Sequence, residues 1–209
     1  DKVLSRFEIA PRQHSALLLP MMDELMAEAA LRPVDLDGLA FGRGPGSFTG
    51  LRIAAGVIQG VAYGADLPVT PVSSLLALAE RARRQFGVER AFCAFDARMQ
   101  EVYWCECQVD ASGHMGVVGS EVVAAPAELP QISASTVPAM GVGSGWEPFA
   151  DVLSQHCGAA LTGTAPTLRV DAQDVAVLGA QMLVAGQGRA PEQALPVYLR
   201  DQVAKKMRQ

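Results

Sequence analysis

The sequence GLAFGRGPGSFTGLR, residues 38–52, contains the pattern that decides the predicted fold. Residues 38–42 are apolar or small and predict a short buried strand, and the glycines that follow allow a tight turn. A helix is expected to begin just after this turn and to run to about Tyr63. A strand, a glycine-rich turn and a helix in this order are typical of a parallel α/β layer.

The segments on either side extend the alternation of strands and helices. We expect strands over residues 1–10, 69–72, 91–95, 101–109, 114–123 and 139–142. We expect helices over residues 12–31, 74–86, 146–156 and 172–185, with caps at Ser73 or Ser74, at Asp171 and at Gly87. The fold class is therefore α/β, with one lobe over residues 1–90 and a second over 91–209. Because residues 1–10 read as the second arm of a hairpin, we expect the first strand of the first lobe to be missing from this sequence.

The composition limits the classes of function. The chain has 209 residues, with 17 Lys and Arg against 22 Asp and Glu, a net charge of −5 and a pI near 5.2. An acidic protein binds nucleic acid weakly on its own, because neutralisation of phosphates by Lys and Arg supplies most of that affinity. No apolar segment is long enough to span a membrane. The four cysteines form no CxxC pair, which indicates a reducing compartment and predicts a cytoplasmic protein.

The glycine-rich turn allows two interpretations. Free backbone N–H groups at the start of a helix favour a phosphate, which would lie against Gly44, Gly46, Ser47 and Thr49. Alternatively, the segment is only a tight turn in which Ser47 or Thr49 caps the helix. The sequence has neither the Gly-Lys-Ser/Thr end of a P-loop nor the G-x-G-x-x-G of a dinucleotide-binding loop, so these templates leave both interpretations open.

Two of the predicted helices contain unusual surface patterns. On the first, an apolar stripe rich in methionine is formed by Leu17, Leu18, Met21, Met22 and Leu25. On the second, glycine recurs every four residues at Gly56, Gly60 and Gly64. A glycine inside a helix costs about 1 kcal/mol relative to alanine, and close approach of another backbone is the usual compensation. That backbone belongs either to the protein's own sheet or to a helix of a second chain.

The charged side chains provide few candidates for catalysis. The three histidines are far apart in the sequence and form no metal-binding pattern. Asp96 ends a predicted strand before a tight turn, where it is either a turn-forming residue or an active-site carboxylate. Glu80 and Arg84, four residues apart on the predicted helix, are interpreted as an exposed ion pair.

Four segments together resemble one protein family. The loop GRGPGSFTGLR at residues 42–52 is the most specific of them, and it is accompanied by residues 13–20, 96–103 and 196–200. With these motifs in this order, the chain resembles the bacterial TsaB (YeaZ) family, which works in tRNA threonylcarbamoyladenosine biosynthesis. The resemblance implies the actin-like (ASKHA, ribonuclease H-like) fold of two related lobes. It also implies a strand ahead of residue 1.

The resemblance implies a supporting role rather than a catalytic one. The catalytic paralogue TsaD binds a metal through a His-x-x-x-His motif, and the matching positions here are Ser74 and Leu78. Because leucine cannot ligate a metal, the resemblance predicts no catalytic residue, no metal and no intrinsic cofactor. ATP or ADP is expected only at the level of a complex.

The partners that the resemblance implies are TsaD and the ATPase TsaE, which transfer threonylcarbamoyl to adenosine 37 of ANN-decoding tRNAs. The first two helices would bind TsaD, or a second copy of the chain when it is alone, and tRNA would be reached only indirectly. A different class of function stays open. In it the chain is an ASKHA-type nucleotide enzyme, such as a small kinase or ATPase, with the glycine-rich turn at the phosphates.

Overall fold

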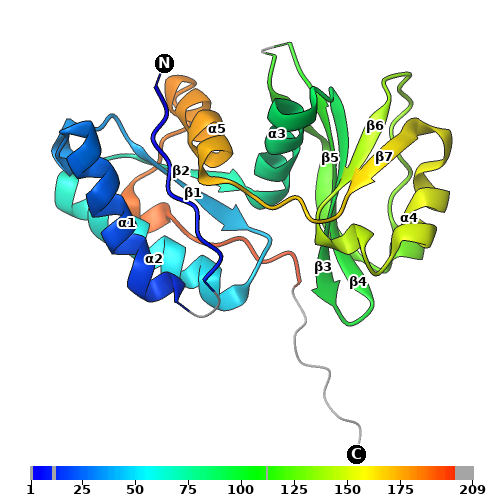
Figure 1. The fold of residues 1–209 in the computed structure, drawn as a ribbon, viewed down its shortest axis with the longest axis horizontal. Coiled ribbons are helices and arrows are strands. Elements are labelled where there is room, and N and C mark those ends of the chain that lie inside the picture. Colours follow the sequence, from blue (N-terminus) through cyan, green and yellow to red (C-terminus); the bar gives the residue numbers. More distant parts are fainter. Residues whose placement is uncertain (1, 11–12, 112, 201–209) are drawn as a thin grey trace, which may run out of the picture.

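The computed structural model describes residues 2–10, 13–111 and 113–200. The α-helices in these residues are α1 (His14–Ala29), α2 (Phe48–Ala65), α3 (Ser74–Phe86), α4 (Ala150–Cys157) and α5 (Ala172–Val184). The strands are β1 (Leu39–Gly44), β2 (Val69–Ser73), β3 (Arg90–Arg98), β4 (Glu101–Val109), β5 (Met115–Ala124), β6 (Ala139–Val142) and β7 (Leu161–Ala165). Figure 1 shows two groups side by side. One is β1 and β2 with α1, α2 and α5, the other is the sheet of β3 to β7 with α4, and α3 lies between the two.

The strands form two sheets of different kinds. β1 and β2 are parallel, in a register that pairs Leu39 with Val69. The larger sheet has the order β5-β4-β3-β6-β7, in which β4 is antiparallel to both neighbours and β6 is parallel to β3 and β7. The predicted α/β class is therefore confirmed, with one parallel and one mixed sheet. The actin-like interpretation and the boundary at residue 90 stay predictions, and α5 packs against β1 and β2 rather than the larger sheet.

One strand prediction was wrong, and one strand of the structure was not predicted. The described residues 2–10 are extended but belong to no sheet; Arg6 instead binds Glu24 and Glu28 of α1 at 3.1 and 2.7 Å. The alternation of side chains was present, but no neighbouring strand pairs with it. β7 was not predicted, because it has only five residues, contains Gly163 and alternates between half-buried and exposed positions. A strand this short gives little periodicity to detect.

Buried clusters lie on both faces of the larger sheet, and two smaller ones pack around β1 and β2. On one face Leu75 and Leu78 of α3 pack on three buried cysteines, Cys93, Cys105 and Cys107. On the other face, Phe92, Trp104, Trp146 and Leu153 form an aromatic cluster. None of the described helices is both long and apolar enough to cross a bilayer.

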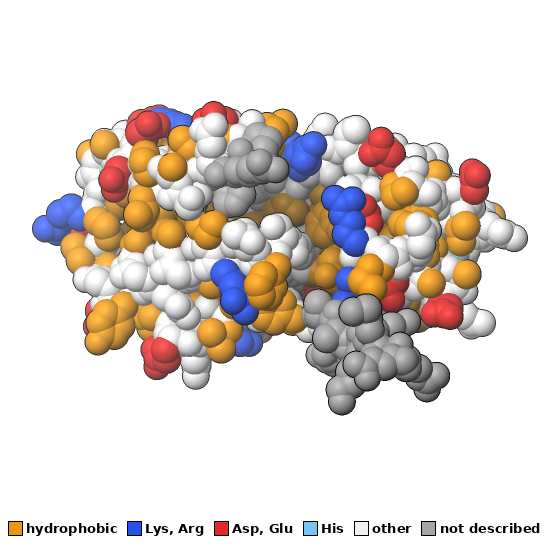
Figure 2. All heavy atoms as spheres, turned by 90° about the horizontal axis from the view of Figure 1, so that it is seen from below, with side chains coloured by type: hydrophobic (Ala, Val, Ile, Leu, Met, Phe, Trp, Pro, Cys, Tyr) orange, Lys and Arg blue, Asp and Glu red, His pale blue; other side chains and the backbone are white. Residues whose placement is uncertain are grey.

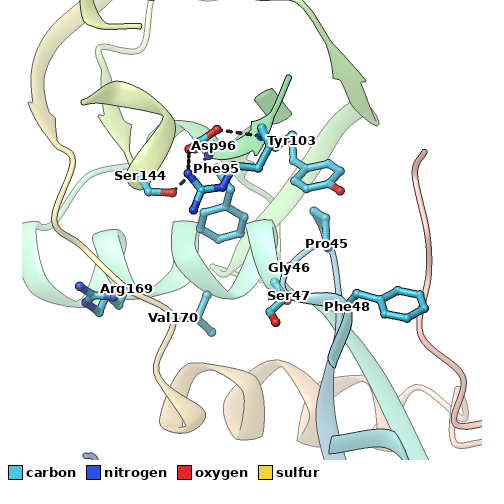
Figure 3. A pocket seen from close by; sticks show the side chains of 13 residues that line it. Pro45, Gly46, Ser47, Phe48, Phe95, Asp96, Tyr103, Ser144, Arg169 and Val170 are labelled. Atoms are coloured by element: carbon cyan, nitrogen blue, oxygen red, sulfur yellow. Dashed lines mark hydrogen bonds and ion pairs between the residues drawn. The ribbon is translucent and has the colours of Figure 1, made fainter. Parts of the chain in front are cut away.

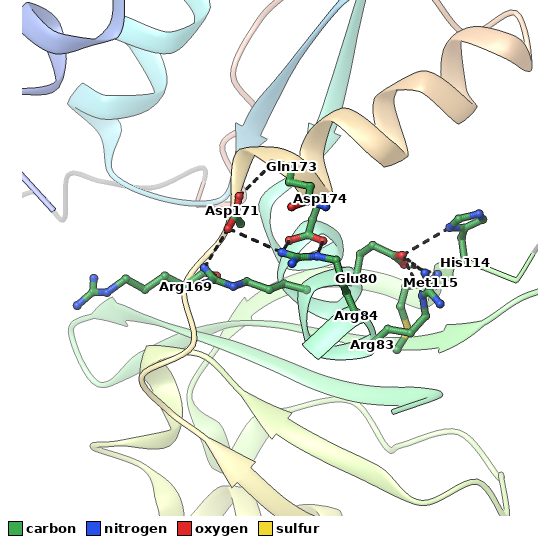
Figure 4. Close-up of polar contacts among 10 residues, drawn as sticks. Glu80, Arg83, Arg84, His114, Met115, Arg169, Asp171, Gln173 and Asp174 are labelled. Atoms are coloured by element: carbon green, nitrogen blue, oxygen red, sulfur yellow. Dashed lines mark hydrogen bonds and ion pairs between the residues drawn. The ribbon is translucent and has the colours of Figure 1, made fainter. Parts of the chain in front are cut away.

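Helices α3 and α5 are joined by an ion pair that the sequence did not suggest. Arg84 binds both carboxylate oxygens of Asp174, at 2.8 and 2.9 Å, and Asp174 is almost fully buried (Figure 4). The predicted pair of Glu80 with Arg84 is therefore wrong. Glu80 is itself buried and accepts hydrogen bonds from Arg83 and from the backbone N–H of Met115. A planar guanidinium prefers the bidentate geometry that Asp174 offers over a neighbour on its own helix.

A second ionic contact joins the two sheets. Arg43, near the end of β1, lies 2.7 Å from Glu121 of β5, whose other carboxylate oxygen accepts a hydrogen bond from the hydroxyl of Ser73. Ser73 also caps α3, since its Oγ accepts a hydrogen bond from the N–H of Leu76 at 3.1 Å. The three side chains thus connect the end of the parallel sheet to the start of α3 and to β5.

The turn between β3 and β4 is strained. Arg98, Met99 and Gln100 have φ angles of 63°, 55° and 62°, a region that side chains other than glycine disfavour by about 1–2 kcal/mol. We therefore expect Gln100→Gly to raise the free energy of unfolding by about 0.5–1 kcal/mol, measured by urea denaturation. The matched control is Gln85→Gly in α3, which should lower it by about as much. If Gln100→Gly did not raise the free energy of unfolding, this turn would not be strained.

Buried carboxylates should make the fold sensitive to acid. Burial acts to raise the pKa of Glu106, but hydrogen bonds from Ser133 and Arg90 outweigh it, and the net pKa lies below its ordinary value of 4.5. The pKa of Glu80 is lowered in the same way, against burial, by Arg83 and the N–H of Met115.

Because the folded pKa values lie below the unfolded ones, these groups stabilise the fold above pH 4.5 and lose that effect as the pH falls through the folded values. We expect the urea midpoint to fall steadily below pH 4.5. The decline should be shallower in Glu80→Gln, and unchanged in Glu147→Gln, an exposed residue without an ion pair in the described chain. Parallel declines in all three proteins would refute this explanation.

Candidate functional site

The glycine-rich turn connects β1 to α2, and two of its residues, Gly44 and Ser47, determine its shape. Gly44 is buried with φ at +107°, and a Cβ there would lie 2.9 Å from the Leu51 side chain and 3.0 Å from the carbonyl oxygen of Val197. Only glycine fits this position without strain. Ser47 is the N-cap, and its hydroxyl accepts a hydrogen bond from the N–H of Gly50 at 3.4 Å. The capped turn is confirmed, with Ser47 rather than Thr49 as the cap, and phosphate contact stays a prediction.

A cleft of about 830 Å³ opens between this turn and the larger sheet (Figure 3). Gly46 and Ser47 line one wall, and Asp96 and Ser144 line the wall opposite. Figure 3 shows the ring of Phe48 pointing away from Asp96 and Ser144, toward the C-terminal segment. The cleft is large enough for a small ligand, since such sites range from about 300 to 1,000 Å³.

Asp96 has the contacts of a turn-forming residue. Its carboxylate accepts a hydrogen bond from the N–H of Arg98 at 2.8 Å and pairs with the guanidinium of the same residue at 3.2 Å. Its backbone N–H donates to the hydroxyl of Ser144 at 3.2 Å. These bonds explain why an aspartate ends β3. The carboxylate of Asp96 therefore lies at the edge of the cleft and is paired with Arg98.

The residues described contain no group of three His, Cys, Asp or Glu side chains that could hold a metal. Leu78, at the position of the second histidine of the TsaD motif, is fully buried in the core beside Gly143. A metal-binding side chain at this position would be enclosed in the core. Burial raises the pKa of the Cys93 thiol and raises that of Cys157 to about 12, which disfavours the reactive thiolate at both positions.

The predicted interface residues lie on α1 and α2, which pack against each other. The five apolar residues of the α1 stripe, Leu17, Leu18, Met21, Met22 and Leu25, are all half-buried. A groove of about 550 Å³ lies between residues 6–10, α1 and α2, and Leu17, Leu18 and Met21 line it. In Figure 2, hydrophobic side chains gather across the half of the surface that belongs to this part of the molecule, with acidic side chains mainly at its margins.

The glycines of α2 face open space. A Cβ placed at Gly56, Gly60 or Gly64 would meet no described atom within 4 Å, apart from the helix's own neighbouring backbone. Their predicted close approach to the protein's own sheet is therefore wrong, because the sheet contacts α2 through Ala55, Ile58 and Ala62 instead. The interpretation that a second chain approaches them stays a prediction.

Comparison with known proteins places this architecture in a family. TsaB of Escherichia coli strain K12, a "tRNA threonylcarbamoyladenosine biosynthesis protein", is 40% identical over 206 residues, which cover 97% of this chain and 87% of the relative. The chain is a member of the TsaB family. A family model described as "TsaD: tRNA N6-adenosine threonylcarbamoyltransferase" matches residues 7–206 and includes the chain in that wider group.

Other TsaB proteins and a solved structure agree with this assignment. TsaB of Haemophilus influenzae is 52% identical over 99 residues, which cover 47% of this chain and 42% of the relative. The structure of YeaZ from Pseudomonas aeruginosa superposes with a TM-score of 0.86 at 41% identity, covering 94% of this chain and 89% of that one. The resemblance to TsaB (YeaZ) expected from the four sequence segments is thus confirmed along nearly the whole chain.

Proposed function

We propose that this chain is a non-catalytic subunit in the formation of N6-threonylcarbamoyladenosine at position 37 of ANN-decoding tRNAs. In this proposal it binds the catalytic paralogue TsaD through α1 and α2 and acts together with TsaE. Membership of the TsaB family supports the pathway. The actin-like fold expected of the family is consistent with the mixed sheet and with the parallel pair β1 and β2. Since tRNA is modified in the cytoplasm, we expect the chain to act there.

The observation that carries the proposal is the exposed glycine row on α2. Glycines inside a helix lower its stability by about 1 kcal/mol each, and no described atom of this chain lies close enough to α2 to require the absence of side chains at these positions. A helix from another molecule can pack closely only where such side chains are absent. The row therefore indicates a helix-to-helix contact with TsaD, or with a second copy when TsaD is absent.

The α1 stripe supports the same surface. Leu17, Leu18 and Met21 line the groove together with Ile53 and Ala54 of α2, so a helix that enters the groove would meet an apolar wall built by both helices. Methionine side chains adapt to different partners because they are unbranched and flexible. This property suits a surface that binds either TsaD or a second copy.

The decisive experiment uses Gly60→Leu in the full chain. A Cβ at this exposed position meets no described atom within 4 Å. At a protein concentration at which both proteins are monomeric, the variant should therefore unfold at a slightly higher urea concentration than the wild type. It should nevertheless fail to co-purify with TsaD and should run as a monomer in light scattering, where we expect the wild type to be a dimer. A gain in stability with a loss of binding separates interface damage from misfolding.

Two further variants complete the test. Met22→Asp places a charge in the α1 stripe and should also abolish co-purification with TsaD. Gly163→Leu, at a glycine of β7 whose added Cβ also meets nothing, should leave the complex intact. Retention of TsaD by both Gly60→Leu and Met22→Asp would overturn the proposed interface.

The alternative function, a nucleotide enzyme with Gly44, Gly46, Ser47 and Thr49 at the phosphates, is supported by the cleft beside Ser47. Its test is calorimetry of the isolated chain with ATP and Mg²⁺, followed by an assay of hydrolysis. Turnover by the chain alone that Ser47→Ala abolishes would favour the enzyme. In the proposed function, ATP or ADP acts only in the assembled complex.

A further inference from the structure

A third cavity lies where the C-terminal segment crosses the start of α2, and it shares Pro45, Gly46, Phe48 and Tyr103 with the cleft. It has a volume of about 650 Å³, and we call it the aromatic recess, after Phe48, Tyr103 and Tyr198 in its lining. The rings of Phe48 and Tyr198 are 5.4 Å apart, at an angle of 37°. The two residues are 55% and 43% exposed, so part of each ring is open to solvent at the same place.

The recess is also positively charged within an acidic protein. Its lining contains Arg52 and Arg200 and no described carboxylate. Arg200 is neutralised by Glu101, whereas Arg52 has no carboxylate partner among the residues described. Most of the described arginines are paired with Asp or Glu, so an unpaired one beside exposed rings is unusual in this chain.

Arg52 is held in a definite orientation. Its guanidinium lies 4.0 Å from the centre of the Phe48 ring, and its Nε donates a hydrogen bond to the hydroxyl of Tyr198 at 3.1 Å. The N–H groups at its other two nitrogens have no described acceptor. A guanidinium fixed in this way can offer two parallel hydrogen bonds to an anion, which is the geometry that a phosphate accepts.

We propose that the aromatic recess binds one unpaired nucleotide, with its base stacked on the exposed rings of Phe48 and Tyr198 and its phosphate bound by Arg52. A nucleotide is the unit that combines a flat π-face with an anion a few ångströms away, and both of these are matched here. Aromatic side chains with arginine are the usual platform for single-stranded RNA, since every base can stack. In the proposed function RNA is reached only through a partner, so a direct contact goes beyond it.

The shared chemistry, a base with its phosphate, could come from single-stranded RNA or from a free mononucleotide. We would titrate the isolated full chain with fluorescein-labelled oligoadenylate RNA, with a labelled RNA duplex and with AMP. Phe48→Leu keeps an apolar side chain but removes the π-face, and Arg52→Gln removes the charge. The matched controls are Tyr63→Leu, on an 83% exposed aromatic of the same helix, and Arg189→Gln, also without a described carboxylate partner.

We expect Phe48→Leu to weaken binding of the oligonucleotide at least about fivefold, since stacking of one base is worth about 1–3 kcal/mol. Arg52→Gln should weaken it as well and reduce the salt dependence by about 0.7 in the slope of log K against log salt, the value for one phosphate on a single strand. Both controls should bind like the wild type, and the duplex should bind more weakly because its bases are stacked.

The outcomes separate the two sources. Binding of oligoadenylate that depends on Phe48 and Arg52 supports the proposal with RNA as the source, and the same dependence seen only with AMP supports it with a free nucleotide. No binding of either probe, or equal losses in the controls, overturns it. Loss of TsaD co-purification in Phe48→Leu without any nucleotide binding would assign the recess to the protein partner and also overturn it. None of these results affects the Gly60→Leu test, so the two proposals fail independently.

Discussion

Replacement of Arg90 by leucine is expected to lower the free energy of unfolding by about 3–5 kcal/mol. Arg90 is fully buried at the start of β3, and its guanidinium binds Glu106 of β4 at 2.6 and 2.9 Å. It also donates to the carbonyl oxygens of Ser133 at 2.9 Å and Val137 at 3.3 Å, which hold the irregular segment between β5 and β6. The variant leaves the buried carboxylate of Glu106 with the hydrogen bonds of Ser133 but without a counter-charge, and it leaves these carbonyls without the guanidinium donor.

Urea denaturation at pH 7 measures this effect, and two comparisons identify its cause. The double variant Arg90→Leu/Glu106→Leu should recover part of the loss, because the uncompensated charge is gone. Arg98→Leu removes an arginine from an ion pair whose guanidinium is 87% exposed, and it should change stability by less than about 1 kcal/mol. If Arg90→Leu and Arg98→Leu had similar effects, burial would not be the reason.

Replacement of Trp146 by alanine should lower the free energy of unfolding by about 3–5 kcal/mol. The indole is 2% exposed, packs against Trp104 at a ring distance of 6.4 Å and donates a hydrogen bond from Nε1 to the carbonyl oxygen of Phe92 at 2.9 Å. Trp146→Phe keeps most of the ring and loses the hydrogen bond, so it should cost less, about 1–3 kcal/mol.

The glycine beneath the indole provides an internal check of this prediction. A Cβ at Gly141 would lie 2.5 Å from Cζ2 of Trp146, so Gly141→Ala alone should destabilise the fold by about 1–3 kcal/mol. In a protein that already has Trp146→Ala, the same change should cost much less, because the space is empty. Additive effects in this double-mutant cycle would show that the two residues are not in contact.

Local chemistry made much of the fold predictable. The caps at Ser73, Gly87 and Asp171 were predicted because a hydroxyl, a glycine or a carboxylate at a helix end acts on its nearest neighbours. Partners distant in the sequence were not predictable. Arg84 binds Asp174 of α5 rather than its neighbour Glu80, and no spacing rule contains that information.

In the candidate site, too, features formed by neighbouring residues were predictable and contacts between distant segments were not. The glycine-rich turn, the α1 stripe and the glycine row on α2 are visible as sequence patterns, although the structure was needed to show that Gly56 and Gly60 face open space. The aromatic recess could not be predicted, because it joins Phe48 and Arg52 to Tyr198 of a distant segment. Its only signal was the run PVYLR at residues 196–200, which contains a tyrosine and an arginine in an extended stretch.

The path of the C-terminal segment has a consequence for the order in which the molecule is built during translation. Arg189 pairs with Val69 beside the parallel sheet, Ala194 is fully buried against it and the N–H of Val197 donates to the carbonyl oxygen of Arg43 at 2.8 Å. The ribosome therefore makes β1 and β2 long before the residues that complete their core. Strands β3 to β7 follow one another in the chain, so their sheet can form before the residues that pack on β1 and β2 have been synthesised. We therefore expect β1 and β2 to complete their core after the larger sheet has formed, although they precede it in the chain.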